Sequence, residues 1–369
     1  MATDQDETYQ SKVRTLLENL IRLYNLQSQK HLILQLFGSL TRECLAYPIT
    51  ERLPPFSLIC IDGTPIQFSV SLSRAQQENR TLRYVTETCK PVMLLPARLS
   101  LTRERIPVIL ELINATHLQP QINEVLDLLL PPAQLLPDHS MFGVWIGVQH
   151  QARSVSTLKI YCNLLWKLSD PWSMFNDTLR LLDRTDVRRV AADARRTLGP
   201  YCWPSCVGLE FTAEGFGRVK LYLRGYQLSW SRILDFIQGL DWSGFEPGFV
   251  RFHEVLLNGR ETYIPRSVVL CIGAPGESGG SYDLKVEVGP QYYLKDDECV
   301  RRRIIKLARE LMLDFKPYEQ MLDVFSNDML TPGAIRYHDV VGVGFNPQIG
   351  PRLNIYLRPD LARYYNPTD

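Results

Sequence analysis

The chain has 369 residues, and its 41 Lys and Arg against 40 Asp and Glu give a formal net charge of +1. Hydrophobic residues make up 45% of the chain and charged residues 22%, which are values typical of a globular protein. This composition excludes a disordered chain, a collagen-like fibre and a generally polybasic nucleic-acid binder.

The sequence shows no signal for export or membrane insertion. No run approaches the roughly 18 apolar residues of a membrane span, and the acidic first seven residues do not resemble a signal peptide. Eight scattered cysteines include no C-x-x-C pair, which favours a reducing compartment. We expect a cytoplasmic protein that binds neither membrane nor nucleic acid. Cys202 and Cys206 could form half a zinc site, but packing is the favoured interpretation because no Cys/His pair follows at metal spacing.

Long amphipathic stretches alternate along the chain with pairs of short strand-like runs. Helical stretches are predicted near residues 12–46, 103–130, 171–198, 228–257 and 296–326. Helix start signals precede three of them, at Asp170-Pro171, at Ser229 or Ser231, and at Asp296-Asp297.

Five β-hairpins are predicted in this pattern. The first pairs residues 57–61 with 65–72 around the tight-turn signal Asp62-Gly63. The others pair, in chain order, 143–148 with 157–163, 206–212 with 218–224, 268–272 with 282–288, and 340–345 with 352–358.

The second strands of the last four hairpins form an internal repeat. They read Lys159-Ile-Tyr161, Lys220-Leu-Tyr222, Lys285-Val-Glu287 and Asn354-Ile-Tyr356, at spacings of 61, 65 and 69 residues. Such regularity indicates a repeated unit of helices plus a hairpin. Ten antiparallel strands tend to close or split, so we predict an α+β fold: one domain over residues 1–369, in which a ten-stranded barrel is surrounded by helices.

Alternation along these strands predicts a polar lumen. Amphipathic helices need an apolar surface to cover, so the apolar strand face points outward and the polar face inward. Several enclosed Lys and Arg side chains are costly without an anion, and a diphosphate fits because Arg binds it bidentately. The neighbouring tyrosines could stabilise a carbocation through their ring faces. The alternative, that these residues are solvated strand faces, is disfavoured by the recurrence of the motif.

Several short motifs together resemble one enzyme family. They are Gly63-Thr-Pro-Ile-Gln-Phe-Ser69, Leu82-Arg-Tyr-Val-Thr-Glu87, Lys159-Ile-Tyr161, Arg218-Val-Lys-Leu-Tyr222, Lys285-Val-Glu287 and Asn354-Ile-Tyr356. From about residue 12 to 360 the chain is similar to the aromatic prenyltransferases with the ABBA (α-β-β-α) barrel. It most resembles the indole branch typified by dimethylallyltryptophan synthases and their bacterial relatives.

The resemblance implies transfer of a dimethylallyl or geranyl group from the prenyl diphosphate to an indole-containing secondary metabolite or peptide. The reaction is an electrophilic aromatic substitution that does not require a metal or another cofactor. The residues that the resemblance assigns to diphosphate binding are Arg83, Lys159, Arg218, Lys220 and Lys285. Those that it assigns to shielding the carbocation are Tyr161, Tyr222 and Tyr356. Asn354 belongs to the same substrate-binding set.

Two positions depart from the family pattern. Gln67 stands where the family usually has a Glu that accepts the indole N–H and assists proton removal, and an amide has no useful basicity. Gln67 then orients the acceptor while another group, water or the departing diphosphate takes the proton, or the acceptor is not a simple tryptophan. Glu287 replaces a shielding tyrosine and could bind an acceptor amine or pair with Lys or Arg.

Other signals leave alternatives open. Gln67 in place of an acid also fits a non-catalytic barrel that binds an anionic isoprenoid-like ligand. Gly276-Glu-Ser-Gly-Gly280 matches the hydrolase motif around Ser278, although the strand predicted after it favours a hairpin loop. Trp145 and Trp166 could line an acceptor pocket or pack in the core. A D-D-x-x-D metal motif is absent, and Asp296-Asp297 is interpreted as a helix start.

Overall fold

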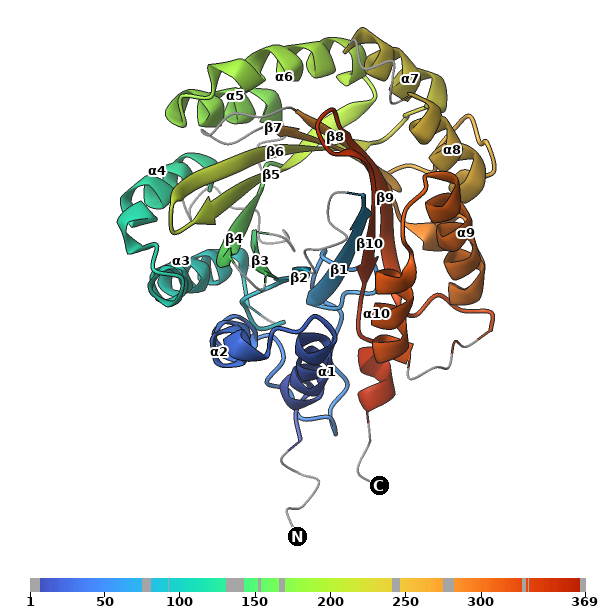
Figure 1. The fold of residues 1–369 in the computed structure, drawn as a ribbon. Helices are drawn as coiled ribbons and strands as arrows, with labels where there is room; N and C mark the ends of the chain where they lie inside the picture. Colours follow the sequence, from blue (N-terminus) through green and yellow to red (C-terminus); the bar gives the residue numbers. More distant parts are fainter. Residues whose placement is uncertain are drawn as a thin grey trace.

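The fold is a closed antiparallel β-barrel surrounded by helices, as Figure 1 shows. The computed structural model describes residues 7–74, 81–91, 93–130, 143–151, 154–165, 170–240, 246–274, 282–326, 330 and 332–365. Within these residues each strand pairs with its neighbours in the sequence, and β1 closes the barrel against β10. The strands are β1 (Ile66–Ser73), β2 (Thr81–Thr86), β3 (Val144–Gln151), β4 (Ser154–Asn163), β5 (Cys202–Thr212), β6 (Gly215–Gly225), β7 (Val268–Ala274), β8 (Asp283–Val288), β9 (His338–Asn346) and β10 (Gly350–Leu357).

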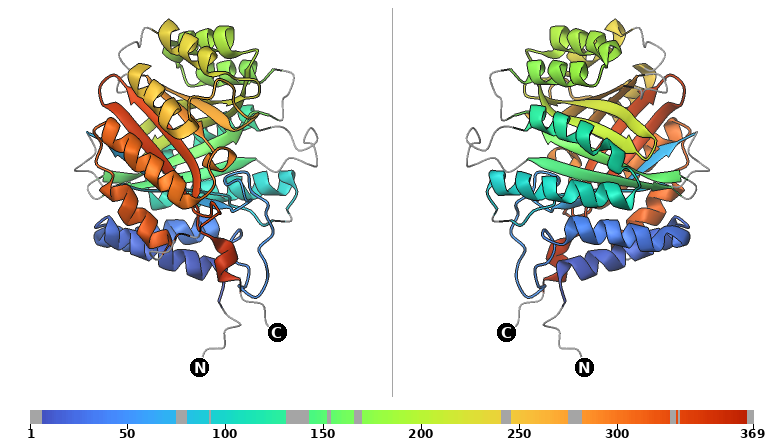
Figure 2. Two further views of the ribbon diagram at one scale, coloured as in Figure 1. Left: turned by 90° about the vertical axis from the view of Figure 1, so that its right-hand side faces the viewer. Right: turned by 90° about the vertical axis from the view of Figure 1, so that its left-hand side faces the viewer.

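Two α-helices precede each β-hairpin, and Figure 2 shows the helices lying on the outside of the barrel. No helix in the described part of the chain is long and apolar enough to cross a membrane. The helices are α1 (Tyr9–Leu23), α2 (Lys30–Thr41), α3 (Leu95–Leu112), α4 (Gln119–Leu129), α5 (Pro171–Leu181), α6 (Thr185–Leu198), α7 (Trp230–Gly239), α8 (Glu246–Leu257), α9 (Asp297–Glu310) and α10 (Lys316–Ser326).

The structure confirms the predicted ten-stranded barrel and four of the five hairpins, but the predicted first hairpin is wrong. Residues 57–61 form no strand, and β1 pairs instead with β2. The turn signal itself is real: Gly63 adopts φ +86°, and the Asp62 carboxylate accepts a hydrogen bond from the Thr64 N–H. The segment before this turn contacts the end of the barrel, because the Ile61 N–H donates to Asp339 on β9 at 3.0 Å.

Each predicted helical stretch is two helices rather than one. Four of the breaks contain a residue in the left-handed region that ends the preceding helix, namely Asn25, Asn114, Asp183 and Met312. Asn and Asp tolerate this conformation, which closes a helix by satisfying its last carbonyl groups. The fourth stretch breaks across residues 240–245, of which 241–245 lie outside the described residues.

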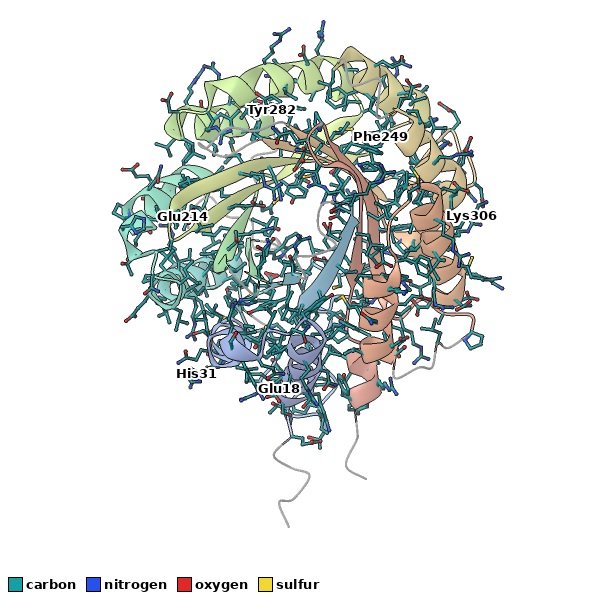
Figure 3. All side chains as sticks on the ribbon, in the orientation of Figure 1. Glu18, His31, Glu214, Phe249, Tyr282 and Lys306 are labelled. Atoms are coloured by element: carbon teal, nitrogen blue, oxygen red, sulfur yellow. The ribbon has the colours of Figure 1, made fainter. Side chains whose placement is uncertain are left out.

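The barrel wall has two chemically different faces, as the strand alternation predicts. Its apolar side chains are buried under the helices: Phe249 of α8 contacts Phe345 of β9 with ring centroids 4.5 Å apart, and Figure 3 shows Phe249 between helix and wall. Lys306 of α9 is exposed and points away from the barrel in the same view. This packing leaves the polar strand face for the lumen.

The helix starts behave as predicted at three places. The side chains of Asp170, Ser229 and Asp296 each accept a hydrogen bond from a backbone N–H in the first turn of α5, α7 and α9. Asp297 behaves differently, because it is fully buried and accepts from the backbone N–H groups of Arg336 and His338 at 2.7 and 3.1 Å. It therefore ties the start of α9 to the start of β9.

Asp297, His338 and Tyr318 are joined by buried side-chain hydrogen bonds. A carboxylate can only accept, so the Nδ1–H of His338 donates to Asp297 at 2.6 Å, and Nε2 accepts from the Tyr318 hydroxyl at 2.7 Å. These hydrogen bonds lower the pKa of Asp297 although its burial acts to raise it.

We predict that Asp297→Ala lowers the free energy of unfolding by about 3 kcal/mol or more, because it leaves buried N–H donors without a partner. Asp296→Ala removes the helix cap and a contact with the exposed Lys295, and should cost about 1 kcal/mol. Urea denaturation of both variants measures the difference. Equal costs for the two neighbouring aspartates contradict the anchoring role of Asp297.

Candidate active site

The barrel encloses a cavity of about 240 Å³ lined by polar side chains. Of the twelve residues predicted for the site, ten line it, and whether they act as predicted stays a prediction. Those ten are Gln67, Arg83, Lys159, Tyr161, Arg218, Lys220, Tyr222, Lys285, Asn354 and Tyr356. Glu287 and Trp145 lie beside the cavity without being part of its lining.

Three cations of the cavity wall meet at Glu210, which sequence analysis did not single out. Glu210 lies on β5, between Lys159 on β4 and Lys220 on β6. The Lys220 and Lys159 ammonium groups lie 2.6 and 3.2 Å from its Oε1. Arg218 Nε lies 3.0 Å from Oε2. Burial acts to raise the pKa of Glu210, but these three cations hold it well below its ordinary value. Glu210 is therefore ionised and holds the cations together.

Asp283 on β8 organises the adjacent part of the wall. It lies 2.8 Å from both Arg218 Nη1 and Arg352 Nη2, and it accepts from the Asn346 amide at 2.8 Å. Arg352 belongs to the predicted polar face but was not assigned to the site. A further cation, Arg83 on β2, donates to Gln149 at 3.1 Å.

The cavity wall formed by these residues has an excess of positive charge. Apart from Lys285, which pairs with Glu287, the lining formed by the described residues has five basic side chains: Arg83, Lys159, Arg218, Lys220 and Arg352. Asp283 in the lining and Glu210 beside it are the two carboxylates of this region, so with all seven groups ionised the excess is three positive charges. We call these seven residues the cationic wall. Burial lowers the pKa values of Lys159, Lys220 and Arg83, as expected where cations are only partly compensated. A multiply charged anion would supply the missing negative charge.

Tyrosines lie next to the cationic wall. Tyr161 and Tyr222 have ring centroids 5.9 Å apart, and burial raises the pKa values of Tyr161, Tyr222 and Tyr356, so all three are neutral phenols. Gly208 makes room for this arrangement on β5: a Cβ there would lie 3.2 Å from both the Tyr161 and Tyr222 rings. Two of these rings already face a cation, because the Lys285 ammonium lies over Tyr356 and Tyr222.

Lys285 and Glu287, two residues apart on the lumen face of β8, contact each other and Tyr356. The Lys285 ammonium donates to Glu287 at 2.5 Å and to the Tyr356 hydroxyl at 2.7 Å. Burial opposes the charge of Lys285, but Glu287 raises its pKa well above the ordinary value. The sequence left open whether Glu287 binds a ligand amine or a protein cation, and in this structure it pairs with Lys285.

Gln67 is held in one orientation. Its amide nitrogen donates to Asp339 at 2.5 Å, and Asp339 also pairs with Arg358 at 2.7 Å. Because the amide N–H₂ is used by a carboxylate, the Gln67 carbonyl oxygen is the atom available to a donor in the cavity. Arg358 also contacts Asp62 at 2.9 Å, which ties the loop before β1 to this end of the barrel.

A buried carboxyl group lies near Gln67. Glu87 follows β2, on the strand face that carries Arg83 and Val85 into the cavity, and accepts from the Ser57 hydroxyl at 3.0 Å. Burial raises its pKa to about 7, although Arg98, Ser57 and the Trp145 indole N–H act to lower it. Trp145 thus contacts Glu87, and no role in acceptor binding is established for it.

Other sequence signals lie outside the described residues or away from the cavity lining. Trp166 and the G-x-S-x-G motif around Ser278 lie outside the described residues. Cys202 is buried, and Cys206 on the same strand is also buried. In the described part of the chain, no group of three or more His, Cys, Asp and Glu side chains is placed to hold a metal ion.

Comparison with solved structures identifies the fold. The chain is similar to 5-dimethylallyltryptophan synthase from Streptomyces coelicolor (TM-score 0.75, 17% identity, covering 97% of this chain and 99% of that one). It is also similar to 6-dimethylallyltryptophan synthase from Micromonospora olivasterospora, solved with DMASPP and Trp (TM-score 0.76, 19% identity, covering 98% of this chain and 99% of that one). AnaPT from Neosartorya fischeri is similar as well (TM-score 0.69, 13% identity, covering 93% of this chain and 91% of that one).

No family model matches the sequence, and no curated protein matches it. The likeness in structure therefore confirms the ABBA prenyltransferase barrel that the motifs led us to expect.

We predict that diphosphate binding is coupled to proton uptake at Lys159. Burial lowers the pKa of this amine in the ligand-free site, and a bound anion raises it again. Affinity should therefore fall as the pH rises from the lowered pKa of the free protein to the higher pKa of the complex. Calorimetric titration of inorganic diphosphate in buffers of different ionisation enthalpy measures the uptake. Equal uptake in wild type and Lys159→Met contradicts the assignment.

We predict that Glu87→Gln stabilises the protein at pH 8 by roughly 1–3 kcal/mol. The folded-state pKa of about 7 exceeds the ordinary value of 4.5, so the stability contribution of Glu87 is present below about pH 4.5 and is lost as the pH rises through 7. The gain should shrink at pH 5, where Glu87 of the folded wild type is largely protonated and as neutral as the Gln side chain. Urea denaturation at the two pH values measures it, and a pH-independent gain contradicts the titration of Glu87.

Proposed function

We propose that this protein is an aromatic prenyltransferase. It transfers a dimethylallyl or geranyl group from the prenyl diphosphate to an indole-containing small molecule or peptide. The observation that supports this most strongly is the direct contact between two unlike regions of one cavity, the cationic wall and the tyrosines. The first suits a diphosphate leaving group, and the second suits the allyl cation that remains when it departs.

Ionisation of the donor comes first in this reaction. The C–O bond breaks and its electron pair stays with the diphosphate, whose growing charge is stabilised by Arg83, Lys159, Arg218, Lys220 and Arg352. The Tyr161, Tyr222 and Tyr356 rings then exclude water and face the allyl cation. Because five protein cations already supply the positive charge that the leaving group requires, we propose that no metal is needed.

The acceptor ring attacks the cation and forms the new C–C bond. Gln67 positions the acceptor by accepting its N–H through the carbonyl oxygen that Asp339 keeps free. Gln67 has no basicity, so the ring proton leaves to the released diphosphate or to water. Asn354 completes the wall between the tyrosines and Arg352.

The solved relatives support this proposal by what they bind. The Micromonospora enzyme holds DMASPP and Trp, and the Streptomyces coelicolor enzyme was also solved with these two molecules. This chain has the same barrel, with its cations and phenols on the inner face. A barrel that only binds an anionic isoprenoid is less well supported, because Gln67 is held in an orientation suited to an acceptor.

The proposal is tested by incubating the protein with dimethylallyl or geranyl diphosphate and a panel of indoles that includes tryptophan and tryptophan-containing peptides. We expect a prenylated indole by mass spectrometry and an equal amount of released diphosphate, with and without EDTA. Binding of donor without diphosphate release would support the non-catalytic barrel. Loss of activity with EDTA would overturn metal independence alone.

Lys220→Ala should weaken binding of the prenyl diphosphate by roughly 10- to 100-fold, as expected for loss of a buried charged contact. Lys306→Ala is the matched control, since Lys306 is an exposed lysine on the outer face of α9. Calorimetry with a non-hydrolysable thio-diphosphate donor measures both variants. Equal affinities would remove Lys220 from the diphosphate site.

A further inference from the structure

The Lys285–Glu287 pair lies at the level of the tyrosines rather than at the cationic wall. Across the hydrogen-bonded strands, Lys285 pairs with Cys271, which pairs with Tyr222. The next row toward the cationic wall joins Asp283 through Gly273 to Lys220. The Lys285 ammonium accordingly lies 5.3 Å from the Tyr356 ring centroid and 5.9 Å from that of Tyr222.

Lys285 and Glu287 are both engaged in contacts with other side chains of the protein. Lys285 donates to Glu287 and to the Tyr356 hydroxyl, whereas Lys159, Lys220 and Arg218 converge on Glu210. The two side chains are 8% and 7% exposed, so neither charge is solvated by bulk water. Gly342 on β9 accommodates the carboxylate, since a Cβ there would lie 2.7 Å from Glu287 Cγ.

We propose that Glu287 neutralises Lys285 inside the ring of tyrosines, so that Lys285 positions Tyr356 instead of binding the diphosphate. This inference rests on the proposed function, because it concerns the place where the allyl cation forms. An uncompensated ammonium within about 10 Å of that cation would slow ionisation roughly tenfold or more at an effective dielectric of about 20. Glu287 is thus a positioning and charge-compensating residue, and it revises the assignment of Lys285 to diphosphate binding.

The first arm of the test needs no turnover. Inorganic diphosphate is titrated into wild type, Lys285→Met and Lys220→Met. The two variants remove an ammonium from different rows of the same barrel. We expect Lys220→Met to weaken binding at least tenfold and Lys285→Met to change it by less than about threefold. Equal weakening by the two variants would overturn the proposal, and it would do so whether or not the protein transfers prenyl groups.

The second arm measures the rate of the chemical step in single turnover with a donor and an acceptor that wild type uses. Glu287→Gln should lower this rate roughly tenfold or more, because it leaves the Lys285 charge uncompensated. Adding Lys285→Met should restore most of the rate, since the double variant has neither charge and nearly the same volume. A double variant as slow as Glu287→Gln would overturn charge compensation. Absence of transfer by wild type would refute the proposed function, while the diphosphate arm would still decide the role of Lys285.

Discussion

The arrangement of this protein depends on positive charge enclosed in a closed sheet. Four cationic side chains of the cationic wall, Lys159, Arg218, Lys220 and Arg352, share two carboxylates, and the fifth, Arg83, donates to Gln149. Burial makes this incomplete compensation costly. Glu210 and Asp283 hold the cations in place without cancelling them. The ligand-free protein therefore holds buried positive charge that the diphosphate of the proposed reaction would compensate.

Strand alternation and strand pairing place this charge beside the tyrosines. Residues i and i+2 of one strand face the same side of the sheet. Tyr161 therefore lies next to Lys159, and Tyr222 next to Lys220, on the inner face of the barrel. Small residues on neighbouring strands make this possible, since the rings fill the space above Gly208. Lys285 departs from this pattern because its ammonium lies among the tyrosines, where it donates hydrogen bonds to Glu287 and Tyr356.

The sequence predicted the barrel and most of the lining because both follow from local periodicity. Lys159, Lys220 and Asn354 repeat at similar spacings with apolar neighbours, and a pattern of that kind depends only on strand geometry. Asp339 could not be predicted in the same way, because its contact with Gln67 joins residues far apart along the chain. Glu210 was missed although Arg218 and Lys220 follow it within the same predicted hairpin, because the repeated motif lies on the second strand and Glu210 lies on the first. The first hairpin was misplaced because Asp62-Gly63 forms a true turn outside the sheet. The helix breaks at Asn25, Asn114 and Asp183 carried a readable signal in a residue type that tolerates the left-handed conformation.

The pairing of β1 with β10 also constrains how the chain reaches its final form. β10 ends at Leu357 and pairs with β1, which begins at Ile66, so the two ends of the sheet meet only after the almost 300 residues between them have been synthesised. Until then the sheet has two open edges and its polar inner face is exposed to water, and a long-range closure of this kind is slow. Premature termination before β10 would therefore produce an open, aggregation-prone sheet rather than a smaller closed barrel.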